Sequence, residues 1–274
     1  MKGLRFMLDN AASKEKINNI KCFILDMDGT IYLGNELFDC TLPFLDKVKD
    51  SGREFYFFTN NSSKSRNAYI EKLRAMGIEI SPDQMMISTH VILRFLAKNH
   101  PGKTVYVVGT PSLLKEFEEG GAKMVEDDPD IVVLGFDTTL NYEKLEKACR
   151  FIRHGSIFYG INPDWNCPVE NGEFIPDCGS IAKLIQASTG VEAQFFGKPS
   201  RHTLDYIIEK TGYKADQIAI VGDRLYTDIA VADKSDVSSI LVLTGESSME
   251  DLEESDVKPD MIFDSLEDIR KLLV

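Results

Sequence analysis

Short apolar segments alternate with segments of helical periodicity along almost the whole chain, and this alternation restricts the fold more than any other feature. The first apolar run covers residues 23–25 and is followed by a helical pattern that Thr41 can cap and Gly52 can end. A second run covers residues 55–58 and is followed by a helix expected over residues 65–76. Strands that alternate with helices at this spacing form right-handed βαβ units around a parallel sheet. The sequence therefore predicts an α/β fold with a doubly wound parallel sheet.

The same alternation continues towards the C-terminus. Further strands are expected over residues 105–108, 131–134, 157–161, 218–221 and 240–243. A small hairpin is expected over residues 30–38, and weak helical character over residues 1–19. The segment Trp165–Cys178 contains two prolines and a glycine and is expected to be a long loop. Loops of this length in a compact domain are often functional.

Composition and charge argue against several classes of protein. With 274 residues, 43% of them hydrophobic, the chain is long enough for two domains and has the composition of a globular protein. Its formal charge of −13 at pH 7 argues against a nucleic acid or an anionic membrane as partner, because either needs a basic surface. The five cysteines show no C-x-x-C spacing and are expected to be reduced thiols. Because we see no signal peptide and no apolar run of about 18 residues, we expect a cytoplasmic protein.

Polar side chains of complementary chemistry follow several of the expected strands, and the carboxyl ends of parallel strands are where α/β sheets bind ligands. They are Asp26 and Asp28 after the first strand, Thr59 and Asn60 after the second, Lys198 after residues 195–196, and Asp223 and Asp228 after residues 218–221. Phosphoryl transfer requires such a set, because it depends on positioning and on neutralisation of charge. A carboxylate can attack phosphorus to form an aspartyl-phosphate, and Mg²⁺ suits oxygen ligands.

Parts of this set also have purely structural explanations. Asp-Gly is a common turn, and Asn60 is of a residue type that is frequent in turns. Asp228 lies five residues after Asp223, near an expected helix N-terminus that it could cap. Trp165 could anchor its segment by burial instead of contacting a ligand. Each motif alone is therefore a weak signal, and the combination decides the interpretation.

In this order, the motifs D-M-D-G-T, T-N-N, G-K-P and G-D-R-L-Y-T-D resemble those of the haloacid dehalogenase (HAD) superfamily of phosphatases. The long βα series between T-N-N and G-K-P resembles the large inserted cap of the subfamily that includes 4-nitrophenylphosphatase-like and NagD-like enzymes. The resemblance covers the chain from about residue 18 onward. It implies a Rossmann-like catalytic core formed by residues 1–87 and 195–274, with a smaller α/β cap over residues 88–194 that sets substrate specificity.

The resemblance also implies roles for the acidic residues. Asp26 would be the nucleophile and a Mg²⁺ ligand. Asp28 would protonate the leaving oxygen and then activate water, and its main-chain carbonyl would bind the metal. Asp223 would bind Mg²⁺, and Asp228 would orient Lys198 or a metal-bound water. Because a dehalogenase usually lacks the acid at position 28, hydrolysis of a phosphate ester is the expected reaction.

The remaining motif residues are expected to bind the substrate. Thr59, with main-chain N–H groups near Asn60, would hold the transferring phosphoryl group. Lys198 would neutralise charge on the nucleophile and on the phosphoryl oxygens. In the expected cap, Asn162 and Asp164 match the region in which this subfamily recognises its leaving group. The expected partner is a small phosphorylated metabolite, and since cap surfaces of this architecture can pair subunits, a homodimer is also open.

Three alternatives stay open at this point. A phospho-acceptor module would carry phosphate on Asp26 without turnover. A metabolite-sensing protein would use the cap cleft for binding alone, although such a binder has no need of an acid/base at position 28. A phosphomutase of the same superfamily would move phosphate between sugar positions without net release. The sequence does not name the substrate, because specificity depends on a few contacts in segments of undetermined position.

Overall fold

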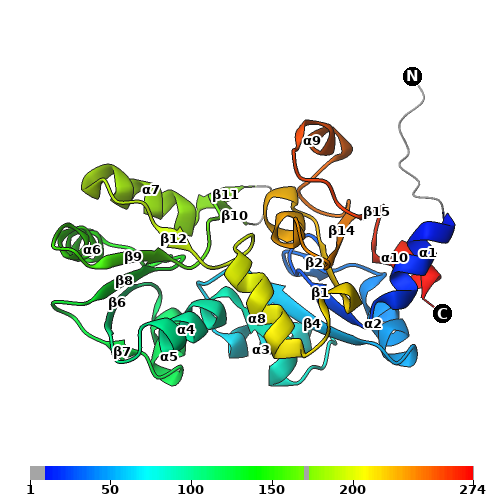
Figure 1. The fold of residues 1–274 in the computed structure, drawn as a ribbon, viewed down its shortest axis with the longest axis horizontal. Helices are drawn as coiled ribbons and strands as arrows, with labels where there is room; N and C mark the ends of the chain where they lie inside the picture. Colours follow the sequence, from blue (N-terminus) through cyan, green and yellow to red (C-terminus); the bar gives the residue numbers. More distant parts are fainter. Residues whose placement is uncertain (1–9, 170–172, 274) are drawn as a thin grey trace. The chain divides into compact units, whose positions relative to one another are not determined.

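The computed structural model describes residues 10–169 and 173–273, and Figure 1 shows its ribbon. The chain forms two compact units, of which the first combines Met1–Phe58 with Leu204–Val274 and the second is Thr59–Thr203. The second unit is therefore inserted into the chain of the first. The predicted insert, residues 88–194, lies inside this second unit, and its exact limits stay a prediction.

A parallel sheet is the centre of the first unit, and its strands lie in the order β15, β14, β13, β1, β4. The bounds are β1 (Cys22–Leu25), β4 (Glu54–Thr59), β13 (Ile218–Gly222), β14 (Ser238–Val242) and β15 (Met261–Phe263). All four residues of β1 are buried, which explains why this strand is a continuous apolar run. In its register, Leu25 lies opposite Val221 of β13 and opposite Phe57 of β4.

Helices accompany this sheet in the first unit (Figure 1). They are α1 (Asn10–Asn19), α2 (Thr41–Asp50), α8 (Arg201–Thr211), α9 (Met249–Glu254) and α10 (Leu266–Leu272), together with the short turns η3 (Ala215–Gln217), η4 (Leu225–Ile229) and η5 (Ala230–Ala232). Helix α2 buries Phe44, Leu45 and Val48 and packs against α10. Thr41 does not cap α2 as expected, because its hydroxyl donates to the carbonyl of Ile31 at 2.7 Å.

The hairpin expected after the first strand is present. It consists of β2 (Tyr32–Leu33) and β3 (Glu36–Leu37), which pair antiparallel around Gly34. Gly34 has φ +59°, a conformation that favours glycine. The helical character expected over residues 1–19 is found in α1, and residues 1–9 lie outside the described part of the chain.

The second unit contains a parallel sheet of its own, with strands in the order β12, β9, β8, β6, β7. The bounds are β6 (Thr104–Val108), β7 (Lys123–Met124), β8 (Ile131–Leu134), β9 (Ile157–Gly160) and β12 (Gln194–Phe195), and the short strand β5 (Met85–Ile87) precedes them in the chain. The three central strands were all expected from their apolar runs, and all four residues of β8 are buried.

Helices lie on both faces of this second sheet, as Figure 1 shows. They are α4 (Ser88–Asn99), α5 (Pro111–Glu119), α6 (Tyr142–Arg153) and α7 (Cys178–Thr189). The helix α3 (Arg66–Ala75) packs instead against β5 and the short turn η1 (Pro82–Gln84). Helices α6 and α7 pack on each other and bury Phe151 and Ile185 in a common core with β8. Helices α4 and α5 also pack together. The predicted fold class, a parallel-sheet α/β core with an inserted α/β cap, is confirmed.

The segment Trp165–Cys178 contains two paired strands, so the expectation of a long loop was wrong for the residues that form them. Strands β10 (Asn166–Pro168) and β11 (Phe174–Pro176) pair antiparallel, with Pro168 opposite Phe174 and Asn166 opposite Pro176. Both prolines lie at strand ends, where the missing N–H costs least, and they concealed the strands in the sequence. Residues 170–172, including the glycine on which the expectation rested, lie outside the described part of the chain.

All five cysteines are free thiols, in agreement with the prediction from their spacing. Within the described ranges, no helix combines the length and the apolar character that a membrane span requires.

Candidate active site

The carboxyl ends of β1 and β13 form a topological switch point of the first sheet. These strands are neighbours, and the chain continues from β1 to β4 on one side and from β13 through β14 to β15 on the other. Ligands of open α/β sheets bind at such reversals of strand order. Asp26 directly follows β1, with its N–H donating to the carbonyl of Val221 at 2.9 Å, and Asp223 directly follows β13. The fold therefore places both acids at one point of the sheet edge.

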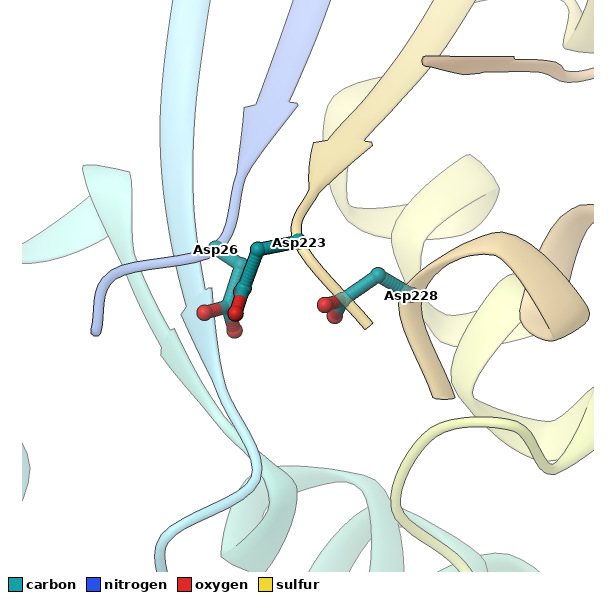
Figure 2. Close-up of side chains that lie close together, drawn as sticks. All are labelled: Asp26, Asp223 and Asp228. Carbon is teal, nitrogen blue, oxygen red and sulfur yellow. The ribbon is translucent and has the colours of Figure 1, made fainter. Parts of the chain in front are cut away.

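Three carboxylates gather there, from Asp26, Asp223 and Asp228 (Figure 2). One oxygen of each lies within 4.8 Å of the others. Asp223 and Asp228 are each 1% exposed, whereas Asp26 is half-buried. Asp228 lies on η4, and the main-chain N–H of Arg224 donates to its Oδ2 at 3.1 Å. Asp228 thus lies within η4, whose N-cap residue is Arg224, so it does not occupy the capping position that its place in the sequence suggested. Its predicted role of orienting Lys198 or a metal-bound water stays a prediction.

The electrostatics of the cluster favour a bound cation. Burial, followed by the charges of Asp228 and Asp26, raises the pKa of Asp223 from 3.8 to about 8. Three ionised carboxylates this close repel one another unless a cation or protons neutralise them. Hard oxygen donors are the ligands that Mg²⁺ takes in proteins, so the donor set fits that ion.

Asp28 is not part of this cluster of carboxylates. Its main chain bridges to Tyr32 across the turn that follows β1, and its side chain is half-buried like that of Asp26, whereas Met27 between them is 1% exposed. The two acids of the motif are thus both partly accessible on either side of a buried residue. The prediction for Asp28 concerned its main-chain carbonyl at the metal and its carboxyl group in proton transfer, and both stay predictions.

The loop after β14 encloses Asp223, and sequence reasoning did not include it in the site. The N–H of Glu246 donates to Asp223 Oδ2 at 2.7 Å, and the N–H of Ser247 donates to the Asp223 carbonyl at 3.1 Å. A Cβ atom on Gly245 would lie 2.0 Å from Asp223 Oδ2, and one on Gly29 would lie 2.4 Å from it. The carboxylate therefore lies between two glycines that leave no room for a side chain. The Thr244-Gly245 pair at a strand end was the available signal.

Arg224 is a second residue near the cluster that the sequence analysis did not include in the site. Its guanidinium does form an ion pair, with Nε 2.7 Å from Glu246 Oε2, but its side chain is only 16% exposed. Its positive charge lowers the pKa of Asp223 and so opposes part of the effect of burial. The ion pair also connects the turn that begins η4 with the loop that donates to Asp223.

The predicted phosphoryl-binding residues lie in the second unit. Thr59, Asn60 and Lys198 are 8%, 6% and 2% exposed. The hydroxyl of Thr59 accepts from the N–H of Asn61 at 3.2 Å. The side-chain amide of Asn60 accepts from the N–H of Lys198 at 2.8 Å and donates to its carbonyl at 2.9 Å. The structure thus brings Asn60 and Lys198 together, and their contact with a phosphoryl group stays a prediction.

Asn162 and Asp164, predicted to contact the substrate, belong to the same buried network. Asp164 Oδ2 accepts from the amide of Asn60 at 2.8 Å and from that of Asn162 at 2.9 Å. The Asn162 amide also donates to Asp177 Oδ1 at 3.0 Å and accepts from the hydroxyl of Ser62 at 2.8 Å. Asn162 and Asp164 are 0% and 2% exposed, so both are fixed inside the unit. Their role in substrate binding stays a prediction.

Two models of known protein families match parts of the chain. A family model described as haloacid dehalogenase-like hydrolase matches residues 23–123, and a second, described as HAD-hydrolase-like, matches residues 195–269. These two matches contain the motifs around Asp26, Thr59, Lys198 and Asp223 on which the sequence prediction rested.

Individual proteins extend the similarity to nearly the whole chain. An acid sugar phosphatase from Staphylococcus epidermidis is 32% identical over 251 residues, which are 91% of this chain and 96% of that protein. The crystal structure of a 4-nitrophenylphosphatase from Thermotoga maritima matches with a TM-score of 0.90 and 43% identity, over 93% of this chain and 98% of the other. NagD from E. coli K-12 matches with a TM-score of 0.83 and 28% identity, over 90% and 97%. The chain therefore belongs to the haloacid dehalogenase-like hydrolase family, among its phosphatases.

Proposed function

We propose that this protein is a Mg²⁺-dependent phosphatase of small phosphate monoesters that works through an aspartyl-phosphate on Asp26. The observation that carries the proposal is the cluster of the half-buried Asp26 with the buried Asp223 and Asp228 at the switch point of the sheet. Asp26 and Asp223, with the carbonyl of Asp28, would hold Mg²⁺. When bound, the ion would neutralise charge on the phosphate oxygens.

In this proposal, the two acids of the first motif carry out the nucleophilic attack and the proton transfers. A carboxylate oxygen of Asp26 attacks phosphorus, the bond to the ester oxygen breaks, and Asp28 donates a proton to the leaving alcohol. Asp28, now ionised, takes a proton from water, whose oxygen attacks phosphorus and releases inorganic phosphate from Asp26. Thr59 and Lys198 would bind and neutralise the phosphoryl oxygens. Partial exposure of Asp26 and Asp28, with Met27 buried between them, supports a role for both acids towards a ligand.

The names of similar proteins support a proposal for the substrate class. Proteins similar to this chain over nearly its whole length are named acid sugar phosphatase and 4-nitrophenylphosphatase. We therefore propose small phosphorylated metabolites, sugar phosphates among them, as substrates.

Phosphate release from 4-nitrophenyl phosphate and from a panel of sugar and nucleoside phosphates tests the proposal. We expect release with Mg²⁺, loss of release with a chelator, and recovery when Mg²⁺ is added back. Full release in the presence of chelator would contradict the role of the metal. Stable phosphorylation of Asp26 without release would favour the phospho-acceptor alternative, and transfer between sugar positions without net release would identify a phosphomutase.

Metal binding should change the pH dependence of stability. Burial and the neighbouring carboxylates raise the pKa of Asp223 from 3.8 to about 8, so between these pH values the folded state without metal is expected to bind more protons than the unfolded state. The free energy of unfolding of the metal-free protein should therefore fall as the pH rises towards 8, and bound Mg²⁺ should compensate this loss. We expect the increase in Tm caused by Mg²⁺ to be larger at about pH 8 than at about pH 5.5. Asp223→Asn should remove most of this difference, and an equal increase at both pH values in the wild type would contradict the prediction.

A further inference from the structure

The side chain of Asn60 forms a two-way contact with the main chain of Lys198. Asn60 Oδ1 accepts from the N–H of Lys198 at 2.8 Å, and Asn60 Nδ2 donates to the carbonyl of Lys198 at 2.9 Å. The second hydrogen on Nδ2 donates to Asp164 Oδ2 at 2.8 Å. Since an amide nitrogen carries two hydrogens, both donors of this side chain are used within the protein. A phosphate oxygen can only accept a hydrogen bond, and the Asn60 side chain has no N–H left to donate to it. The role of this side chain is therefore to hold Lys198 and Asp164.

Gly197 shows how closely the two segments approach. Its N–H donates to the carbonyl of Ile161 at 2.6 Å. A Cβ atom at this position would lie 2.7 Å from Asn60 Oδ1 and 3.0 Å from the Ile161 carbonyl oxygen. Only glycine therefore lets the chain before Lys198 lie on the amide of Asn60 and on the end of β9.

Asp164 determines which way the amide of Asn60 faces. If the amide were turned over, its NH₂ group would face the N–H of Lys198 and its oxygen would face two acceptors, the Lys198 carbonyl and the Asp164 carboxylate. The observed orientation satisfies all three contacts. Asp164 is held in turn, because its Oδ2 also accepts from Asn162, which is fixed by Ser62 and Asp177. The network therefore fixes the loop that precedes α8.

We propose that Asn60 and Asp164 are positioning residues for Lys198: the Asn60 amide fixes the main chain of Lys198, and Asp164 fixes the amide. The inference rests on the proposed function, in which Lys198 neutralises phosphoryl charge. Such neutralisation requires the ammonium group to be in place before the reaction, and a displacement of about 1 Å can cost about a hundredfold in rate. The network would act on kcat, because the effect is on charge that develops in the transition state.

Asn60→Asp tests the contact without changing the size of the side chain. It puts a carboxylate against two acceptors, the Lys198 carbonyl and Asp164. We expect kcat to fall by about tenfold or more with a much smaller change in KM. The double variant Asn60→Asp with Asp164→Asn restores a donor opposite an acceptor between these two positions and should recover part of the loss. Asn141→Asp is the matched control, since Asn141 caps α6 through its Oδ1, which the substitution retains.

Two further measurements connect the effect to Lys198. In a Lys198→Ala background, Asn60→Asp should cause no additional loss of kcat, whereas a general structural defect would still add one. Amide hydrogen exchange reads the contact independently of activity, and Asn60→Ala should selectively increase exchange at the N–H of Lys198. An unchanged kcat in folded Asn60→Asp, a full additional loss in the Lys198→Ala background, or unchanged exchange at Lys198 would each overturn the inference. Wild-type activity of Lys198→Ala would instead contradict the proposed function, while the exchange measurement would still report on the contact.

Discussion

Asp26→Asn is expected to abolish phosphate release, with a fall in kcat on the order of 10⁴-fold or more. A neutral carboxamide is a poor nucleophile, because its nitrogen lone pair is delocalised and its oxygen carries no full charge. It also removes one of the three anionic groups that can hold a cation, so Mg²⁺ affinity should fall together with the rate. The measurement is release of 4-nitrophenol and of inorganic phosphate at saturating Mg²⁺.

The Asp26→Asn variant should remain folded, so a loss of activity would come from the missing nucleophile and not from unfolding. The carboxamide has nearly the shape of the carboxylate, and losing one charge relieves repulsion with Asp223 and Asp228. We therefore expect the Tm of metal-free Asp26→Asn to be no lower than that of the wild type. Asp46→Asn, on the exposed side of α2, makes the same charge change away from the cluster and should retain wild-type activity. Wild-type rates in a folded Asp26→Asn variant would exclude Asp26 as nucleophile.

The clustering of Asp26 with Asp223 could be predicted from sequence because each directly follows a buried apolar strand. Parallel strands end at one edge of their sheet, so residues at these ends gather whatever their separation in the chain. The sequence did not determine which strands are neighbours. The pairing of β1 with β13 makes the ends of these two strands the switch point, and it depends on long-range packing that no local pattern encodes.

Other parts of the site were not predicted, because they consist of main-chain groups or of glycines that leave room for a neighbouring side chain. The loop after β14 holds Asp223 with the N–H of Glu246, and any residue type except proline supplies an N–H. The contact of Asn60 with Lys198 joins residues 138 positions apart through the main chain of one of them, so residue types carry little information about it. The hairpin of β10 and β11 was missed for a different reason: its prolines resemble loop residues until the pairing shows that they end the strands.

Gly245→Ala is the second substitution with a large expected effect. The new methyl group would lie 2.0 Å from Asp223 Oδ2 and 2.5 Å from Asp223 Cγ, so the carboxylate must move. It cannot move towards Gly29, where the main chain already approaches it closely. Asp223 would therefore lose the N–H of Glu246 and its place beside Asp26. Residues that orient metal ligands typically contribute about 10- to 100-fold to affinity.

We accordingly expect Gly245→Ala to need about 10- to 100-fold more Mg²⁺ for half-maximal activity, with part of the rate recovered at high Mg²⁺. Titration of activity and of Tm with Mg²⁺ measures both effects. Gly102→Ala is the control for backbone strain, since Gly102 has φ +79° and no atom close to an added Cβ. That control should lose about 1 kcal/mol of stability and keep its Mg²⁺ dependence. If Gly245→Ala kept the wild-type Mg²⁺ dependence, the loop after β14 would have no part in holding Asp223, and the metal would depend on the strand ends alone.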